Sequence, residues 1–148
     1  MIRRYEQQDI QVLLDLIEQH LSTSSMKDIR FSRTKMSDLL HGNLRNLTFF
    51  VNVAVKDGQV VGGFCASLSA YIFSHEVMAV DNIFYIHPDH RDTQLATELV
   101  ESYIEWAKNR KVRQIRLMNV TGLRPETFEK FAQKFGFRYV GSVHLMEA

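Results

Sequence analysis

One stretch decides the fold: Ile83-Phe-Tyr-Ile-His-Pro-Asp-His-Arg-Asp-Thr-Gln-Leu-Ala-Thr-Glu-Leu99. Residues 79–86 are rich in β-branched and aromatic side chains, which favours a strand. Pro88 ends that strand because proline has no amide to donate to a neighbouring strand. Asp92 or Thr93 then caps a helix whose apolar residues follow at helical spacing. The stretch therefore predicts a helix N-terminus that opens at the end of a strand.

Such a junction is typical of an anion site. The first turn of a helix leaves backbone N–H groups unpaired, and the positive end of the helix dipole lies at the same place. Arg91 adds a full positive charge beside them. Phosphate binding is the chemistry that this arrangement predicts.

The same residues resemble the GCN5-related N-acetyltransferases (GNAT). In that family the pattern Arg/Gln-x-x-Gly-x-Gly/Ala opens a helix after a strand and an x-Pro, and its amides hold the pyrophosphate of acetyl-coenzyme A. Here the run is Arg91-Asp-Thr-Gln-Leu-Ala96, so the first and last positions match and Gln94 replaces the central glycine. The resemblance implies a pantetheine arm along the backbone of Phe84 and Ile86. The coenzyme-binding residues that it implies further along are Arg91, Asp92, Thr93, Gln94, Leu95, Ala96 and Thr97.

Length and composition fit one soluble domain over residues 1–148, of which 45% are apolar and 24% charged. The net charge of +1 provides no basic footprint for nucleic acid. No apolar run is long enough for a membrane span or a signal peptide, so we expect no membrane association and a cytoplasmic location. Cys65 has apolar neighbours and is expected to be an inert packing residue.

Periodicity and turn residues predict the remaining elements. Asp57-Gly58 is a strong hairpin signal, and Gly62-Gly63 indicates a bulge in the strand that follows. The expected strands are 2–5, 49–56, 59–71, 79–86, 113–119 and 139–146. The expected helices are one capped by Asp9 and ending near Ser22, then 35–44, 93–110 and 125–134.

This order predicts an α/β fold with a central mixed sheet and about four helices. It agrees with the GNAT family along nearly the whole chain, and Lys134-Phe-Gly-Phe137 is similar to the family's helix-ending Lys-Leu-Gly-Phe. The resemblance implies that the strand ending at Ile86 splays away from residues 113–119. The pantetheine arm would lie in the gap.

Acetyl transfer to an amine needs a base for the amine proton and an acid for the departing thiolate. Asp81 is the first candidate base because it lies near the family's usual position, with Glu76 second and His75 third. The candidates for the acid are Tyr139, Tyr71 and water, and a further alternative is that there is none. The family's tyrosine position holds Ala132 here, and its asparagine position holds Pro125.

The sequence makes two further predictions about the site. Helix geometry directs the Gln94 side chain back toward the anion site, so we expect it to obstruct the phosphates partly and Gln94→Gly to tighten coenzyme binding. The six histidines have no metal-ligand spacing, so no metal site is expected.

The predicted function is transfer of an acetyl group from acetyl-coenzyme A to a primary amine of a small molecule or a protein. Gln94 and Ala132 leave two alternatives open. One is a catalytically inactive accessory or structural protein with this fold, and the other binds acyl-coenzyme A without turnover. The oligomeric state is also open, with a homodimer as one alternative.

Overall fold

The computed structural model describes residues 1–91, 93–119 and 124–148. Its core is a five-stranded sheet in the order β1-β2-β3-β4-β5. All neighbouring strands are antiparallel except β4 and β5, which are parallel. The strands are β1 (Ile2–Arg4), β2 (Phe49–Lys56), β3 (Gln59–Ala70), β4 (Val77–Ile86) and β5 (Gln114–Ile115). This mixed sheet with helices confirms the predicted α/β class.

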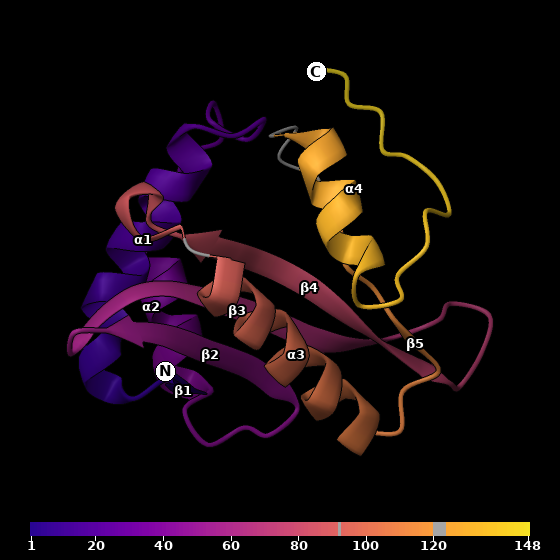
Figure 1. The fold of residues 1–148 in the computed structure, drawn as a ribbon, viewed down its shortest axis with the longest axis horizontal. Coiled ribbons are helices and arrows are strands. Elements are labelled where there is room, and N and C mark those ends of the chain that lie inside the picture. Colours follow the sequence, from indigo (N-terminus) through magenta and orange to yellow (C-terminus); the bar gives the residue numbers. More distant parts are fainter. Residues whose placement is uncertain (92, 120–123) are drawn as a thin grey trace.

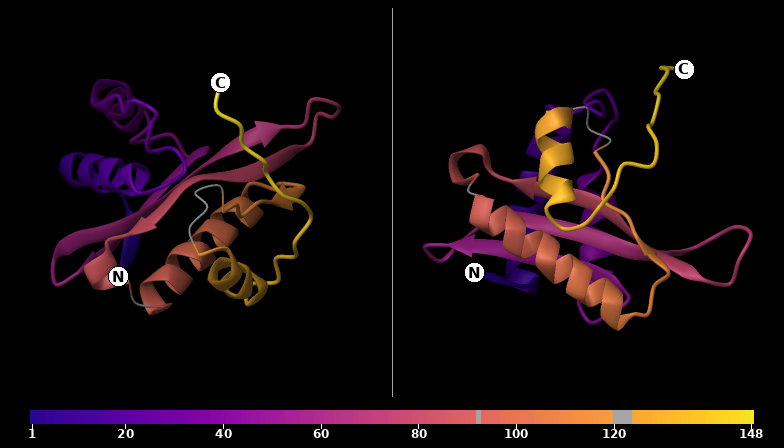
Figure 2. Two further views of the ribbon diagram at one scale, coloured as in Figure 1. Left: turned by 90° about the horizontal axis from the view of Figure 1, so that it is seen from above. Right: turned by 45° about the vertical axis from the view of Figure 1, so that its right-hand side comes forward.

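Helices cover both faces of the sheet. In Figure 2, α1 and α2 lie on one face, and α3 and α4 lie on the other. The helices are α1 (Ile10–Ser22), α2 (Arg33–Gly42), α3 (Thr93–Asn109) and α4 (Pro125–Gln133), with short 3-10 turns at η1 (Gln7–Asp9) and η2 (Pro88–His90). No helix in the described ranges is long and apolar enough to cross a membrane.

Two apolar clusters hold these layers together. On the α3 face, Leu99, Val100 and Tyr103 are fully buried against β2, β3 and β4. On the α1 face, Leu13 and Leu14 pack with the second cluster. Cys65 belongs to that second cluster, and burial raises the pKa of its thiol to about 12. The prediction of an inert packing cysteine is confirmed.

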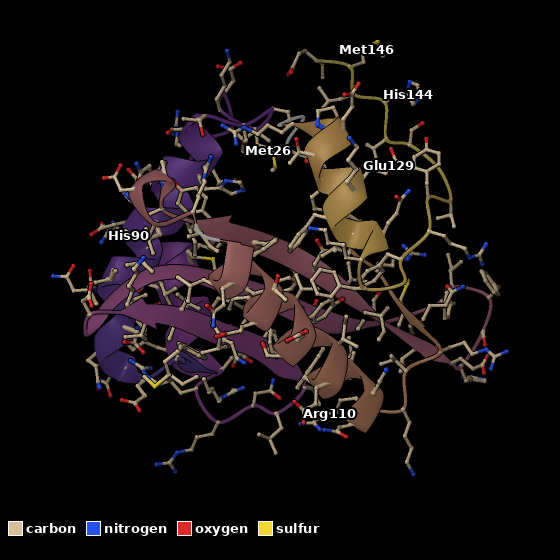
Figure 3. All side chains as sticks on the ribbon, viewed as in Figure 1. Met26, His90, Arg110, Glu129, His144 and Met146 are labelled. Atoms are coloured by element: carbon tan, nitrogen blue, oxygen red, sulfur yellow. The ribbon has the colours of Figure 1, made fainter. Side chains whose placement is uncertain are left out.

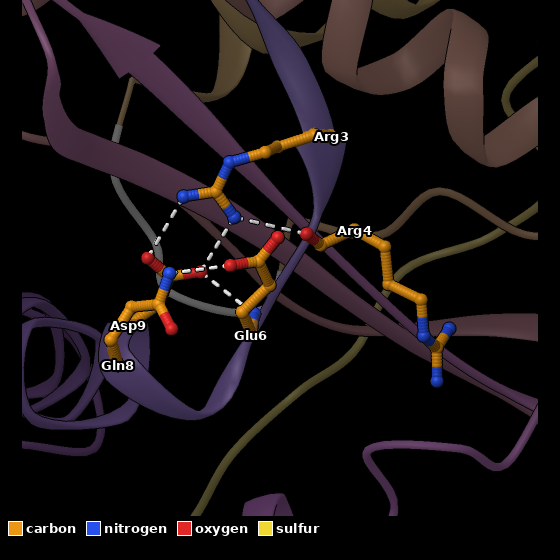
Figure 4. A network of polar contacts seen from close by, with 5 residues as sticks. All are labelled: Arg3, Arg4, Glu6, Gln8 and Asp9. Atoms are coloured by element: carbon orange, nitrogen blue, oxygen red, sulfur yellow. Dashed lines mark hydrogen bonds and ion pairs between the residues drawn. The ribbon is translucent and has the colours of Figure 1, made fainter.

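The start of α1 differs from the prediction in one detail. Asp9 does precede the helix, but its carboxylate accepts no hydrogen bond from an amide of α1 and belongs to a capping box with Glu6 at the start of η1. Instead it accepts two hydrogen bonds from the Arg3 guanidinium, at 2.6 and 3.0 Å, and one from the Glu6 amide at 2.7 Å (Figure 4). The charge-assisted pair with Arg3 of β1 occupies both carboxylate oxygens and holds the side chain away from the amides of α1.

The C-terminal segment corrects a second prediction. Residues 139–146 were expected to form a strand, but residues 137–148 have no regular structure. Tyr139 is 69% exposed, and His144 and Met146 lie on a chain that runs outside the helices and the sheet (Figure 3). An alternating apolar pattern forms a strand only beside a free strand edge, and this segment pairs with none in the described structure.

Smaller differences concern element ends. The helix predicted from Lys35 begins at Arg33, because the Ser32 hydroxyl accepts the Lys35 amide and caps the helix two residues earlier. The predicted β3 bulge is present, since the register shifts by one residue beside Gly62. The strand predicted over 113–119 is reduced to β5, which has two residues.

Candidate functional site

The site begins where β4 and β5 stop pairing. The two strands pair at Met78 and Ala79, and the Arg116 amide donates to the Ala79 carbonyl at 2.9 Å. One step further, the Met118 amide donates to the Asp81 carboxylate oxygens at 3.1 and 3.0 Å. A side chain thus replaces the main-chain acceptor that a continued strand would offer. Beyond Asp81 the two segments separate, as the resemblance implied.

A bulge in β4 exposes part of its backbone at this point. Ala66 pairs with Asp81 and Cys65 with Ile83, so Asn82 is an extra residue in β4. After the bulge, the His87 amide donates to Val61 in β3, whereas the Ile86 carbonyl accepts the Arg91 Nε on the outer side. Backbone groups alternate along a strand, so those of Phe84 also face outward. No strand in the described ranges pairs with this edge.

A cavity of about 330 Å³ follows this open edge. It is lined by residues from the end of α1 and from α4 (both labelled in Figure 1), two helices that lie on opposite faces of the sheet in Figure 2. Met26, labelled in Figure 3, belongs to its wall on the α1 side, and Phe128 and Phe131 of α4 line the opposite side. Ala96 brings the wall to the first turn of α3. The cavity is mostly apolar and reaches the helix N-terminus that the sequence predicted as an anion site.

Asp81 provides a carboxylate on the cavity wall, and burial shifts the pKa of this group. Its residue is 7% exposed, and burial raises the pKa of its carboxyl to about 6, although the Met118 amide acts in the opposite direction. Tyr103 lies nearby and donates its hydroxyl to the Arg116 carbonyl at 2.8 Å. Burial raises the pKa of that phenol, and the Asp81 charge adds to the increase. Asp81 therefore changes charge close to neutral pH while Tyr103 keeps its proton.

The other predicted catalytic residues lie elsewhere. Glu76 is at the far end of β4 in the β3–β4 hairpin, exposed, with its carboxylate 3.9 Å from Arg113. His75 is exposed beside it. Tyr71 donates to the Gln114 side chain, and Tyr139 is in the exposed C-terminal segment. None of these four lines the cavity, so the structure brings only Asp81 to it.

Four of the nine predicted coenzyme-binding residues lie at the cavity. Phe84, Ile86, Arg91 and Ala96 line it. Further along α3, which begins at Thr93, Leu95 is buried and Thr97 is half-buried. Asp92 is outside the described residues. The assignment of this set to acetyl-coenzyme A stays a prediction.

Gln94 corrects the expectation about obstruction. Its side chain is exposed and donates to the Glu98 carboxylate at 2.9 Å, one turn further along α3. It therefore points along the helix and not back toward the anion site. A hydrogen bond between residues i and i+4 competes with the backward rotamer on which the expectation relied. The described geometry gives no support to an obstructing Gln94.

His20 of α1 and Tyr85 of β4 are among the residues of the cavity wall that the sequence did not predict. A signal for His20 was present in the sequence, because it continues the apolar stripe of Leu13, Leu16 and Ile17 at helical spacing. A polar residue on a buried stripe marks a position with a special environment. In the described ranges, no group of three His, Cys, Asp or Glu residues is placed to hold a metal ion.

Comparisons with known proteins agree with this geometry. A sequence profile of the acetyltransferase (GNAT) family matches residues 14–137. A predicted acetyltransferase from Clostridium acetobutylicum, solved with acetyl-CoA, has a TM-score of 0.78 and 16% identity, covering 99% of this chain and 95% of that one. An aminoglycoside 6'-N-acetyltransferase from Acinetobacter haemolyticus has a TM-score of 0.73 and 18% identity, covering 100% and 97%. No curated protein sequence matches this chain significantly.

Proposed function

Because this chain belongs to the acetyltransferase (GNAT) family, we propose that it transfers an acetyl group from acetyl-coenzyme A to a primary amine. The observation that carries the proposal is Asp81, a buried carboxylate with a raised pKa on the wall of an apolar cavity. Perturbed carboxylates in clefts are typical of general acid–base catalysis.

The residues of the cavity fit the coenzyme. Acetyl-coenzyme A is the family's co-substrate and, when bound, supplies the acetyl group as a thioester. The outward backbone groups of Phe84 and Ile86 would pair with the amides of the pantetheine arm as a strand would. The first turn of α3 would hold the phosphates by its amides and its dipole. Ala96 leaves room there because its side chain is small.

Asp81 would accept the proton that the amine loses as its nitrogen bonds to the acetyl carbon. A pKa of about 6 keeps the carboxylate mostly ionised at neutral pH and close to the optimum for a base. The Met118 amide fixes its orientation. The departing thiolate needs one proton in return, and since neither Tyr71 nor Tyr139 lines the cavity, water is the acid that this proposal uses.

The test starts with calorimetric titration of acetyl-coenzyme A and coenzyme A, followed by thiol release and mass detection of product with a panel of primary amines. We expect saturable binding and acetylated product, and we expect Asp81→Asn to bind the coenzyme with little product. Binding without product from any amine would favour an acyl-coenzyme A binder, which Ala132 at the family's tyrosine position would also fit. Absence of binding would favour a structural protein.

A further inference from the structure

Two side chains replace the next step of the ladder between β4 and β5. Main-chain pairing reaches the bond from the Arg116 amide to the Ala79 carbonyl, at 2.9 Å. In a parallel ladder of this register, the Asp81 amide would next donate to the Arg116 carbonyl, and the Met118 amide to the Asp81 carbonyl. Instead, the Arg116 carbonyl accepts the Tyr103 hydroxyl at 2.8 Å. The Met118 amide donates to the Asp81 carboxylate, so side chains occupy both groups that the 113–119 segment would offer to β4.

The core on the α3 face holds the Tyr103 hydroxyl in place. Tyr103 is fully buried, and its ring stacks on Phe64 of β3 with the centroids 4.6 Å apart. Phe50 of β2 packs beside it at 5.8 Å between centroids. A buried tyrosine is favourable only where its hydroxyl finds a partner, because an unpaired hydroxyl loses its hydration. The ring is therefore fixed with its hydroxyl on the Arg116 carbonyl.

The environment of the Asp81 carboxylate depends on this arrangement. Hydrogen bonds from the Met118 amide and from the Asp81 amide itself lower the pKa of the carboxyl, against the larger effect of burial. A free Arg116 carbonyl would be the acceptor for the Asp81 amide. That bond would bring the Met118 amide onto the main-chain carbonyl of Asp81. The carboxylate would then lose both donors.

We propose that Tyr103 is a positioning residue for Asp81: by holding the Arg116 carbonyl, its hydroxyl stops the ladder one step early and leaves the Met118 amide to the carboxylate. This inference rests on the proposed function, because it concerns how the proposed base of the same site is held. Tyr103 does not line the cavity, so it acts only through the segment that carries Arg116 and Met118.

The other groups around Asp81 can be separated from this effect. The charged or titratable side chains of the described structure that line the cavity with Asp81, or lie beside it on α3, are Arg91, Arg124, His20 and Tyr103. On β3, the uncharged Ala66 lies opposite Asp81. Arginine keeps its charge at every pH used, and burial lowers the pKa of His20 on the α1 side. A titration that vanishes in Asp81→Asn is therefore that of Asp81.

An NMR titration of the free protein tests the positioning without turnover. Carbon-13 in the aspartate carboxyl groups reports Asp81, and the Met118 amide proton should shift with the same midpoint because it donates to that carboxylate. Tyr103→Phe should raise the midpoint by about 0.5 pH unit or more and at least halve the shift of the Met118 amide. Tyr5→Phe is the matched control and should change neither. It removes a buried hydroxyl that donates to the Leu40 carbonyl at 2.6 Å, on the α1 face of the sheet.

Three results of this titration would overturn the proposal. The first is a Met118 amide that does not titrate with Asp81 in the wild-type protein. The second is a Tyr103→Phe titration that superimposes on that of the wild type. The third is an equal change in Tyr5→Phe, which would mean that any lost buried hydroxyl has this effect. Each of them would leave the proposed function standing.

Kinetics separates positioning from a general loss of packing. For an amine of the panel that gives product, the ratio of kcat/KM in Tyr103→Phe to that in the wild type cancels the ionisation of the amine. We expect a loss of about threefold or more below the two midpoints and recovery toward about pH 8.5, where both carboxylates are ionised. A ratio equally low at every pH would show a packing role only and overturn the proposal. If no amine is acetylated but the NMR changes are seen, the proposed function fails while the positioning of Asp81 stands.

Discussion

The two halves of β4 have the same neighbour on one side and different neighbours on the other. Both halves pair with β3, but only the first half, at Met78 and Ala79, pairs with β5. The second half presents its outer edge to the cavity. Asp81 stands at the boundary, where its carboxylate takes the Met118 amide that the next pair of a ladder would have used. A site arises here because strand pairing ends inside the protein.

The largest expected effect is on the boundary residue itself. Asp81→Asn should lower kcat/KM for an amine by about 10²–10⁴, the usual contribution of a general base. Glu76→Gln is the matched control, because Glu76 is an exposed carboxylate at the other end of β4. It should change kcat/KM less than twofold. Equal losses in the two variants would show that the boundary has no special role.

The same carboxylate should make stability depend on pH. Its pKa is raised from 3.8 to about 6 by burial, so the folded state holds the proton in that interval while the unfolded state releases it. Stability contributed by Asp81 is therefore complete below about pH 4 and lost as pH rises to about 6, a change on the order of 3 kcal/mol. Denaturant unfolding of Asp81→Asn should lack this decline relative to wild type. Parallel pH profiles of the two proteins would contradict it.

The close packing of Gly62 of β3 against the second half of β4 can be tested separately. A Cβ on Gly62 would lie 2.7 Å from the Tyr85 carbonyl oxygen, so the end of β4 would have to move. Gly62→Ala should lower the free energy of unfolding by about 1–3 kcal/mol, as overpacking does. Gly42→Ala, with nothing within 4 Å of its Cβ, is the control and should not destabilise. Identical unfolding curves for both variants would mean that β4 accommodates the methyl group.

The smallest effect is expected at Gln94. Gln94→Ala removes the hydrogen bond to Glu98, which should cost about 0.2–0.5 kcal/mol of helix stability. Affinity for acetyl-coenzyme A, measured by calorimetry, should change less than twofold because the side chain points along α3. A clear gain in affinity would restore the obstruction that the sequence predicted.

The sequence predicted the local parts of this account well. Pro88 and the apolar spacing after Thr93 predicted the strand and the helix, and these predictions depend on short-range rules for turn and capping residues. Cys65 was assigned correctly from its apolar neighbours. Asp81, in contrast, was predicted from its match to the family's usual base position.

What the sequence could not predict depends on partners distant along the chain. Residues 116–119 have a strand-like pattern, yet Met118 donates to a side chain and not to a strand. Residues 139–146 alternate without an edge to join. His20 was set aside for lacking metal spacing, and only the fold shows that α1 places its ring against Tyr85 on the cavity wall. Pairing partners of this kind are tertiary information that a local pattern does not contain.

Amide hydrogen exchange along β4 tests the central claim most directly. The claim is that the outer edge of the second half binds acetyl-coenzyme A through the backbone of Phe84 and Ile86. Exchange at these two amides, followed by NMR, should slow markedly when acetyl-coenzyme A is saturating, while exchange at Tyr85, whose amide faces β3, should change little. Unchanged exchange at Phe84 and Ile86 under saturating acetyl-coenzyme A would contradict the account.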